Sequence, residues 1–268
     1  MHPVLFSFDN PVTGASLQVT TYAALMFLGV AASIGLSSWL ARRRGLPAFD
    51  VFAAGAIAFG VGFLGARLAF LLLNGKPEGV PWSVFLTTSG GLVWYGGFAG
   101  GALGALLYLR GYRIPLLPMI EIAGPGLALG HAFGRLGCFT AGCCHGAFAP
   151  DAALTVVFPP GGLAPPGIPL HPVQLYEAGA LLLLSGALLV LHLRLGERWR
   201  EGTTFALYLG GYAVLRFFTE MLRDDDRGGF LAGLSPAQWT SIVLLVLLGA
   251  ALIWVRKSAD DNDMVVKA

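Results

Sequence analysis

The most reactive stretch of the chain begins at Arg135, close to the end of an apolar segment. All of the chain's cysteines follow, together with a histidine, within eight residues of one another: Cys138, Cys143, Cys144 and His145. Thiols and imidazole are nucleophiles and metal ligands, and a neighbouring guanidinium favours the thiolate form that does this chemistry.

Three roles stay open for these thiols. Cys138 could form a disulfide with Cys143 or Cys144 in an oxidising compartment. The three thiols and His145 could bind zinc, although adjacent cysteines make a four-ligand set sterically awkward. One thiol could instead be a nucleophile that carries a transferred group. The expected state is without metal, and no cofactor is expected.

Three arginines lie within apolar segments rather than in loops, namely Arg67, Arg135 and Arg216. An unpaired charge at the middle of a bilayer costs about 2.5–3.5 kcal/mol on insertion scales, so such residues usually face a polar interior. Arg135 lies near a segment end, where a long side chain could also extend to the interface.

Polar residues around Arg216 recur with helical spacing. Tyr212, Arg216, Glu220 and Arg223 follow one another at intervals of four, four and three residues, which places them on one face of a helix. We expect an Arg216–Glu220 ion pair, either as a structural pair or in a polar cavity that opens toward the outside.

Several further polar residues of the apolar segments are expected at the same level of the membrane as these arginines. Arginines gathered with such groups suit an anionic phospholipid head, because guanidinium binds phosphate in a bidentate manner. An enzyme acting on phospholipid is the favoured hypothesis, and a lipid-binding or transport protein is its competitor. The expected lining residues are Tyr22, Tyr95, Glu121, His131, His171, Gln174, Tyr176 and Glu177.

The elements that must position these groups are membrane helices. Hydrophobic residues make up 56% of the 268 residues and charged residues 12%, with a mean hydropathy of +0.71. These values are typical of an all-α protein with several membrane spans. No long basic run is present, so nucleic acid is not an expected partner. Seven spans are predicted, at about 17–40, 49–73, 86–109, 115–135, 172–193, 203–222 and 237–255.

The basic residues predict the orientation of these spans. Lys and Arg concentrate after alternate spans, which indicates a cytoplasmic C-terminus and an external N-terminus. The segment 138–171 carries no Lys or Arg and should form a small external head on a single transmembrane domain, residues 1–268. The cytoplasmic set is Arg42, Arg43, Arg44, Arg110, Arg113, Arg194, Arg198, Arg200, Arg256, Lys257 and Lys267, against Lys76, Arg223 and Arg227 outside.

Glycine is abundant in the third and fourth predicted spans. Small residues at four-residue spacing let helix backbones approach closely. The alternative is that they leave room for a lipid or a bent helix. The glycines are Gly90, Gly91, Gly96, Gly97, Gly100, Gly101, Gly104, Gly124, Gly126, Gly130, Gly134 and Gly137.

At these residues the chain resembles the prolipoprotein diacylglyceryl transferases. The similarity follows the chain in order through six motifs. They are Tyr22 in the first span, Gly-Gly-Leu-Val-Trp-Tyr95-Gly-Gly, Gly134-Arg135-Leu-Gly137-x-Phe139, His171-Pro-x-Gln174-Leu-Tyr176-Glu177, Arg216-Phe-Phe-Thr-Glu220-Met-Leu-Arg223 and Leu234-Ser-x-x-Gln238-Trp.

The resemblance implies transfer of a diacylglyceryl group from phosphatidylglycerol to the lipobox cysteine of a preprolipoprotein signal peptide, with release of glycerol phosphate. It implies that Arg135 holds the lipid phosphate and that Arg216, supported by Glu220, stabilises the leaving phosphate. Tyr95 matches a position implicated in activating the thiol, and His171 or His131 are alternative bases by chemistry.

The chain departs from the family pattern after Gly134-Arg135. The family has Asn-Phe-x-Asn-x-Glu-x-x-Gly where this chain has Cys138-Phe-Thr-Ala-Gly-Cys-Cys-His-Gly146. The missing Asn and Glu residues keep two alternatives open. One is a related transferase with a different lipid or acceptor, and the other is a non-catalytic lipid-binding or thiol-redox membrane protein.

Overall fold

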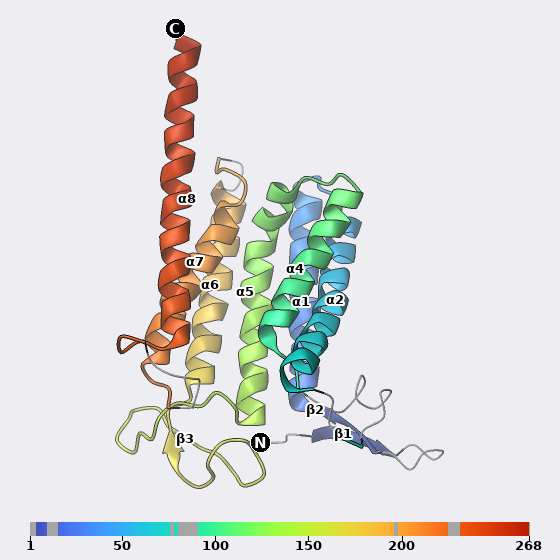
Figure 1. Ribbon diagram of the computed structural model, residues 1–268, viewed down its shortest axis with the longest axis vertical. Helices are drawn as coiled ribbons and strands as arrows, with labels where there is room; N and C mark the ends of the chain where they lie inside the picture. Colours follow the sequence, from blue (N-terminus) through green and yellow to red (C-terminus); the bar gives the residue numbers. More distant parts are fainter. Residues whose placement is uncertain are drawn as a thin grey trace. The chain divides into compact units, whose positions relative to one another are not determined.

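The computed structural model describes residues 4–9, 16–75, 78–79, 91–195, 198–224 and 231–267, and the chain there is mainly helical (Figure 1). Lys76, Gly90, Arg227 and the start of the expected 86–109 span lie outside these residues. The described helices are α1 Thr21–Arg43, α2 Ala48–Asn74, α4 Trp94–Gly111, α5 Leu116–Ala141, α6 Val173–Leu195, α7 Thr203–Glu220 and α8 Pro236–Lys267.

Two short antiparallel hairpins accompany these helices. Strands β1 (Val4–Asp9) and β2 (Ser16–Thr20) pair before α1, and β3 (Val156–Val157) and β4 (Pro169–Leu170) pair between α5 and α6. The second hairpin packs on a small apolar core of Phe158, Ala164 and Leu170. The segment between α5 and α6 is therefore folded.

The described helices follow the predicted spans but differ from them at several ends. Helix α4 begins only at Trp94, and α8 continues to Lys267 instead of ending at about 255. The first helix begins at Thr21 instead of about residue 17, because Ser16–Thr20 pairs as a strand. The fourth span ends at Ala141 instead of about 135, so Cys138 lies inside a helix. Gly142, with a φ of 73°, supplies the left-handed conformation that commonly ends a helix.

Five of the helices are long and apolar enough to cross a membrane. They are α1, α2, α5, α6 and the part of α8 from Pro236 to Ile253. Large apolar side chains on them are widely exposed, as at Leu183 (77%) and Phe49 (76%). Apolar surface of this extent needs a hydrocarbon solvent. The chain is an all-α, multi-pass membrane protein, as the composition predicts.

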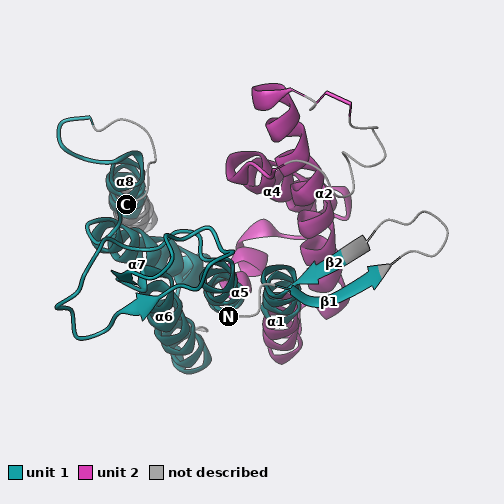
Figure 2. Cartoon of the chain, turned by 90° about the horizontal axis from the view of Figure 1, so that it is seen from below, with its two compact units in different colours: residues 1–33, 124–268 teal, residues 34–123 magenta. Residues whose placement is uncertain are grey.

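The chain divides into two compact units (Figure 2). The first comprises residues 1–33 and 124–268, and the second residues 34–123, so α1 and α5 each contribute to both. The boundary in α5 lies next to Pro125, which has no N–H to continue the helical hydrogen bonding. In the first unit, the Ser185 hydroxyl on α6 donates to the Pro125 carbonyl at 2.8 Å.

Helices α2 and α4 in the second unit pack backbone to backbone through glycine. A Cβ added at Gly65 would lie 2.4 Å from the Gly96 carbonyl oxygen, and one added at Gly96 would lie 2.4 Å from that of Gly65. The Tyr108 hydroxyl of α4 also donates to Asp50 of α2 at 2.8 Å. The close-packing interpretation of these glycines is confirmed.

Glycine also permits close contacts of α5 within the first unit. A Cβ at Gly130 would lie 2.9 Å from the Gly29 carbonyl oxygen on α1, and one at Gly124 would lie 2.9 Å from the Thr204 carbonyl oxygen on α7. These contacts hold α5 between α1 and α7. The C-terminal half of α5, which carries Arg135, is thereby fixed next to the residues of α7.

Candidate active site

Glu177 on α6 is the centre of the polar cluster in the first unit. Its side chain is 0% exposed. The Arg135 Nε of α5 lies 2.5 Å from one carboxylate oxygen, and the Arg216 Nη1 of α7 lies 3.0 Å from the other. The Thr219 hydroxyl donates to the same oxygen as Arg216, at 2.8 Å. One buried carboxylate thus bridges guanidinium groups from two helices.

A second carboxylate extends this cluster to α8. Glu220 forms an ion pair with Arg216 Nη2, one turn away on α7. The Ser235 hydroxyl donates to the other Glu220 oxygen at 2.9 Å, and Ser235 is the residue before α8. The Ser235 N–H donates in turn to Gln238, which completes a capping box. The expected Arg216–Glu220 pair is confirmed.

Aromatic and imidazole groups cover one side of Arg135. Its Nη2 donates to the Tyr212 hydroxyl at 3.2 Å. The His131 ring, one turn earlier on α5, packs in a tilted arrangement on Tyr212 with 4.4 Å between ring centroids, and its Nδ1 lies 3.3 Å from the Tyr208 hydroxyl. Arg135 does not extend to an interface, because its side chain is only 13% exposed and is paired with Glu177.

The cluster gathers at corresponding ends of four helices. Arg135 is near the C-terminal end of α5 and Arg216 near that of α7, whereas Glu177 is near the N-terminal end of α6 and Ser235 precedes α8. Successive helices in the unit therefore bring their site residues to one end. The positive charges after α6, at Arg194, Arg198 and Arg200, lie at the opposite end of that helix.

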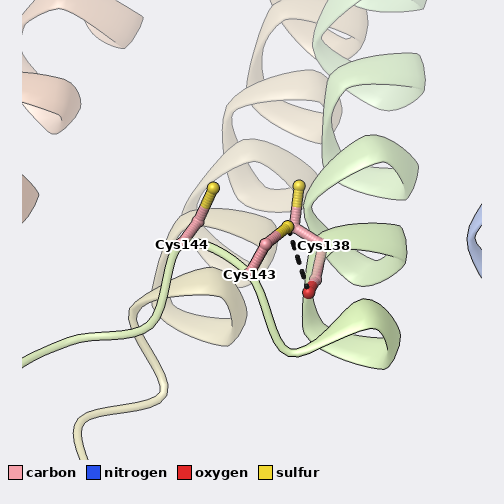
Figure 3. Close-up of side chains that lie close together, drawn as sticks. All are labelled: Cys138, Cys143 and Cys144. Atoms are coloured by element: carbon pink, nitrogen blue, oxygen red, sulfur yellow. Dashed lines mark hydrogen bonds between the residues drawn. The ribbon is translucent and has the colours of Figure 1, made fainter. Parts of the chain in front are cut away.

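The three sulfur atoms lie together beside this cluster. Cys138 is in the last turn of α5, and Cys143 and Cys144 follow Gly142 (Figure 3). Their Sγ atoms all lie within 4.8 Å of one another. All three are free thiols, so the structure contains neither of the two disulfides that the sequence left open. His145 is not part of the group, since its Nδ1 lies 3.0 Å from the Gly146 carbonyl oxygen.

The sulfurs influence each other's ionisation. Hydrogen bonding with Cys138 and Cys143 lowers the pKa of Cys144, and the charges of Arg223 and Arg135 lower it further. Hydrogen bonding with Cys138 and Cys144 raises the pKa of Cys143.

Side chains from α6 hold the cysteine loop in place. The Gln174 Nε2 donates to the Cys143 carbonyl at 2.7 Å, and Gln174 lies one turn before Glu177. The Gly146 N–H donates to the His171 carbonyl at 2.9 Å, and Gly146 also bridges to Arg223. A Cβ at Gly146 would lie 2.5 Å from the His171 Cβ, so this contact requires glycine.

The remaining predicted residues of the first unit lie around the cysteine loop and α5. The Tyr176 hydroxyl donates to the Leu154 carbonyl at 3.0 Å and lies 3.4 Å from His171 Nδ1. Tyr22, at the start of α1, lies against Gly137, where an added Cβ would be 3.1 Å from the tyrosine ring. Tyr22 also interacts electrostatically with Arg135 and with the three cysteines.

Three predicted residues belong to the second unit, namely Glu121, Tyr95 and Arg67. Glu121 is buried on α5. Tyr95, expected to be catalytic, is in the first turn of α4; its side chain is 69% exposed and packs edge-on against Trp94. The buried Arg67 of α2 donates from Nη1 to the Gly91 carbonyl at 3.1 Å and lies over the Phe63 ring. Arg67, which the sequence places among the candidate binding residues, therefore joins α2 to the segment before α4.

The arginines are paired inside the cluster. Glu177 pairs with both guanidinium groups, and Glu220 pairs with that of Arg216. A separate shallow cavity of about 290 Å³ lies on α7 and α8 and has an apolar lining of Val214, Phe217, Phe218, Ile242 and Leu245.

Three residues of the cluster were missed from the sequence: Thr219, Ser235 and Tyr208. A signal existed for Ser235, because Ser-x-x-Gln before an apolar run predicts a capping box. Thr219 lies three residues after Arg216 and so shares its helix face. Tyr208 offered only the same four-residue spacing before Tyr212.

Known proteins are similar in sequence to this chain over nearly its whole length. A family model described as prolipoprotein diacylglyceryl transferase matches residues 10–255. The phosphatidylglycerol–prolipoprotein diacylglyceryl transferase 2 of Clostridium perfringens is 32% identical over 89% of this chain and 91% of its own length. The phosphatidylglycerol–prolipoprotein diacylglyceryl transferase of Symbiobacterium thermophilum is 35% identical over 97% of this chain and 98% of its own.

A match of this extent, on a multi-pass helical frame whose arginines meet at one buried carboxylate, establishes the family. The chain belongs to the prolipoprotein diacylglyceryl transferases.

Proposed function

We propose that this chain transfers the diacylglyceryl group of phosphatidylglycerol to the cysteine thiol of a prolipoprotein and releases glycerol phosphate. The relatives carry this activity in their names, and they align with 89% and 97% of the chain. The observation in this chain that carries the proposal is the bridging of Arg135 and Arg216 by Glu177.

The bridge supports an oxyanion site because a carboxylate resembles part of a phosphate. Glu177 presents one oxygen to each arginine, so the two guanidinium groups stand at a spacing that fits two oxygens of a single anion. Each guanidinium carries more N–H donors than these contacts use. A lipid phosphate would bind to the remaining donors while Glu177 and Glu220 keep the arginines oriented.

The same arginines would act when the bond to the lipid breaks. The acceptor sulfur attacks the glyceryl carbon bonded to the phosphate oxygen, a C–S bond forms, and the C–O electron pair remains on the departing phosphate. Arg135 would hold the phosphate, and Arg216 would stabilise its growing charge. Tyr95 is the proposed group that takes the thiol proton, with His171 or His131 as alternatives.

The membrane arrangement is also part of the proposal. The chain crosses a bacterial inner membrane seven times, with the N-terminus outside and the C-terminus in the cytoplasm, as a single transmembrane domain. The basic residues at the C-terminal end of α6 support this orientation. The cluster of Arg135 and Arg216 then lies toward the outer leaflet, and the folded 138–171 segment forms an external head. Phosphatidylglycerol and a signal peptide meet there.

The test uses the purified full chain in vesicles of phosphatidylglycerol that is labelled in its terminal glycerol. A peptide with a lipobox cysteine should gain the mass of a diacylglyceryl group, and labelled glycerol phosphate should appear in equal amount. A peptide with serine in place of the cysteine is the matched control. Turnover of lipid without a thioether product would indicate another acceptor, and no turnover would indicate a lipid-binding protein; either result overturns the proposal.

A further inference from the structure

The three thiols are arranged as one ligand set. Cys138 comes from a helix and Cys143 and Cys144 from the loop that follows, yet their sulfurs all lie within 4.8 Å of one another (Figure 3). Cys144 has a positive φ of 63°, which is unusual for a residue with a Cβ. This conformation lets two adjacent residues direct their sulfurs to one place. It removes the steric objection to adjacent ligands.

The loop is fixed at both ends before any ligand arrives. The Cys143 N–H donates to the Cys138 carbonyl at 3.2 Å, and Gln174 holds the Cys143 carbonyl at 2.7 Å. Beyond the cysteines, the Ala147 N–H donates to the Leu222 carbonyl at 2.8 Å, after α7. The Cys143 thiol adds a weak hydrogen bond to the Cys138 carbonyl at 3.7 Å (Figure 3), but the backbone bonds and Gln174 hold the loop as well.

The spacing of the sulfurs suits a thiophilic divalent ion. Zinc binds thiolate at about 2.3 Å in tetrahedral geometry, which separates two sulfur ligands by about 3.8 Å. The Sγ atoms lie at most 4.8 Å from one another, about 1 Å more than this separation. Rotation of the cysteine side chains can close that difference. A disulfide would use only two of the three sulfurs.

The set has three protein ligands and leaves the fourth position open. His145 does not supply it, because its ring lies outside the group. Three protein ligands with an open position are typical of catalytic zinc, whereas structural zinc has four. A thiol that binds at such a position loses its proton and becomes a nucleophile near neutral pH.

The thiol group is joined to the arginine cluster through two helices. On α5, Arg135 lies three residues before Cys138, so the two side chains are neighbours on one face. On α6, Gln174, which holds the cysteine loop, lies three residues before Glu177, which holds both arginines. A ligand on the sulfurs is therefore beside the proposed phosphate site.

We propose that Cys138, Cys143 and Cys144 bind a zinc-like divalent ion whose open position receives the acceptor thiol of the prolipoprotein. This inference rests on the proposed transferase function. The metal-bound sulfur forms the C–S bond as the C–O bond of the lipid breaks. The thiol proton goes to the general base of the proposed transferase, and no redox change occurs. A weak base then suffices, because the metal has already lowered the pKa of the acceptor thiol.

The first experiment measures metal in the full-length protein, purified without chelator and then incubated with zinc. Elemental analysis should give about one equivalent per chain after desalting. Cys138→Ser, Cys143→Ser and Cys144→Ser should each lower bound zinc by more than about tenfold, since loss even of an outer partner costs about 10–100-fold. His145→Ala is the matched control and should keep the metal. Stoichiometric disulfide found by mass spectrometry, or equal zinc in all variants, overturns the proposal.

The second experiment tests the open position with cobalt in place of zinc. Thiolate-bound cobalt absorbs in the near ultraviolet and visible, so a lipobox peptide should shift the visible bands, and its serine version should not. An unchanged spectrum with the cysteine peptide overturns the role of the acceptor.

Transfer from phosphatidylglycerol, assayed in parallel, separates this inference from the function itself. Activity equal to wild type in the triple serine variant overturns the metal site and leaves the transferase proposal standing. Metal binding and a peptide-dependent cobalt shift without any lipid transfer leave the thiol site standing and overturn the function.

Discussion

At the scale of single residues, the cluster depends on one carboxylate. Glu177 is completely buried, and its negative charge balances part of the positive charge of Arg135 and Arg216. Its removal therefore leaves positive charge without compensation. Breaking a buried ion pair by removing one partner is strongly destabilising, because the remaining charge stays out of water. Glu220 contacts only Arg216 of the two arginines and has a second partner in Ser235.

The first prediction compares these two carboxylates. Glu177→Gln should lower the free energy of unfolding in detergent by about 3–5 kcal/mol, and Glu220→Gln should lower it by less. Denaturant titration followed by tryptophan fluorescence measures both. Equal losses in the two variants would show that Glu177 is not shared between the arginines in the way that the structure indicates.

The second prediction concerns the arginine proposed to hold the lipid phosphate. Arg135→Lys keeps the positive charge but loses the planar donors that reach Glu177 and Tyr212. We expect the rate of transfer to fall by about 10²-fold or more while the protein still folds. The exposed Arg113→Lys is the control. A variant with full activity at position 135 would remove the guanidinium from the mechanism.

At the scale of helices, glycine decides which elements can approach. Gly65 and Gly60 are on the same helix, α2, but an added Cβ at Gly65 meets the Gly96 backbone at 2.4 Å, whereas nothing lies within 4 Å of one at Gly60. Backbone cannot move aside as a side-chain end can. The two positions therefore separate the packing effect of glycine from its effect on helix propensity.

The third prediction uses this pair. Gly65→Ala should destabilise the protein by about 1–3 kcal/mol, because α2 and α4 must move apart. Gly60→Ala should be neutral or stabilising by up to about 1 kcal/mol, since alanine favours the helix. Thermal unfolding in the same detergent compares them. A loss at Gly60 as large as that at Gly65 would argue against direct backbone contact.

At the scale of the whole molecule, the distribution of charge predicts the orientation. The basic residues after α6 lie at the end of that helix opposite to Glu177. Because positively charged loops stay in the cytoplasm, the site should be external, where lipoprotein precursors emerge. The 138–171 segment, without Lys or Arg, should be external with it.

The fourth prediction tests this topology with alkaline phosphatase, which is active only outside the cytoplasm. Fusion after Gly161 should give active enzyme, and fusion after Arg200 should give inactive enzyme of similar abundance. Activity measured on whole cells, with immunoblots for abundance, checks both. The opposite result would place the arginine cluster on the cytoplasmic side.

The sequence by itself determined the helices, the polar face of α7 and the family, because hydrophobic periodicity, helical spacing and motifs are properties of neighbouring residues. Only the tertiary structure decided that Glu177 joins Arg135 to Arg216 and that three sulfurs converge. The Glu177–Arg216 contact spans 39 residues of sequence, and the packing of α5, α6 and α7 determines which charges meet. The pairing of both arginines inside the cluster has the same origin, since buried charges pair with whatever carboxylate packing brings near. The gathering of the thiols depends on a left-handed backbone at Cys144, which no residue type there signals.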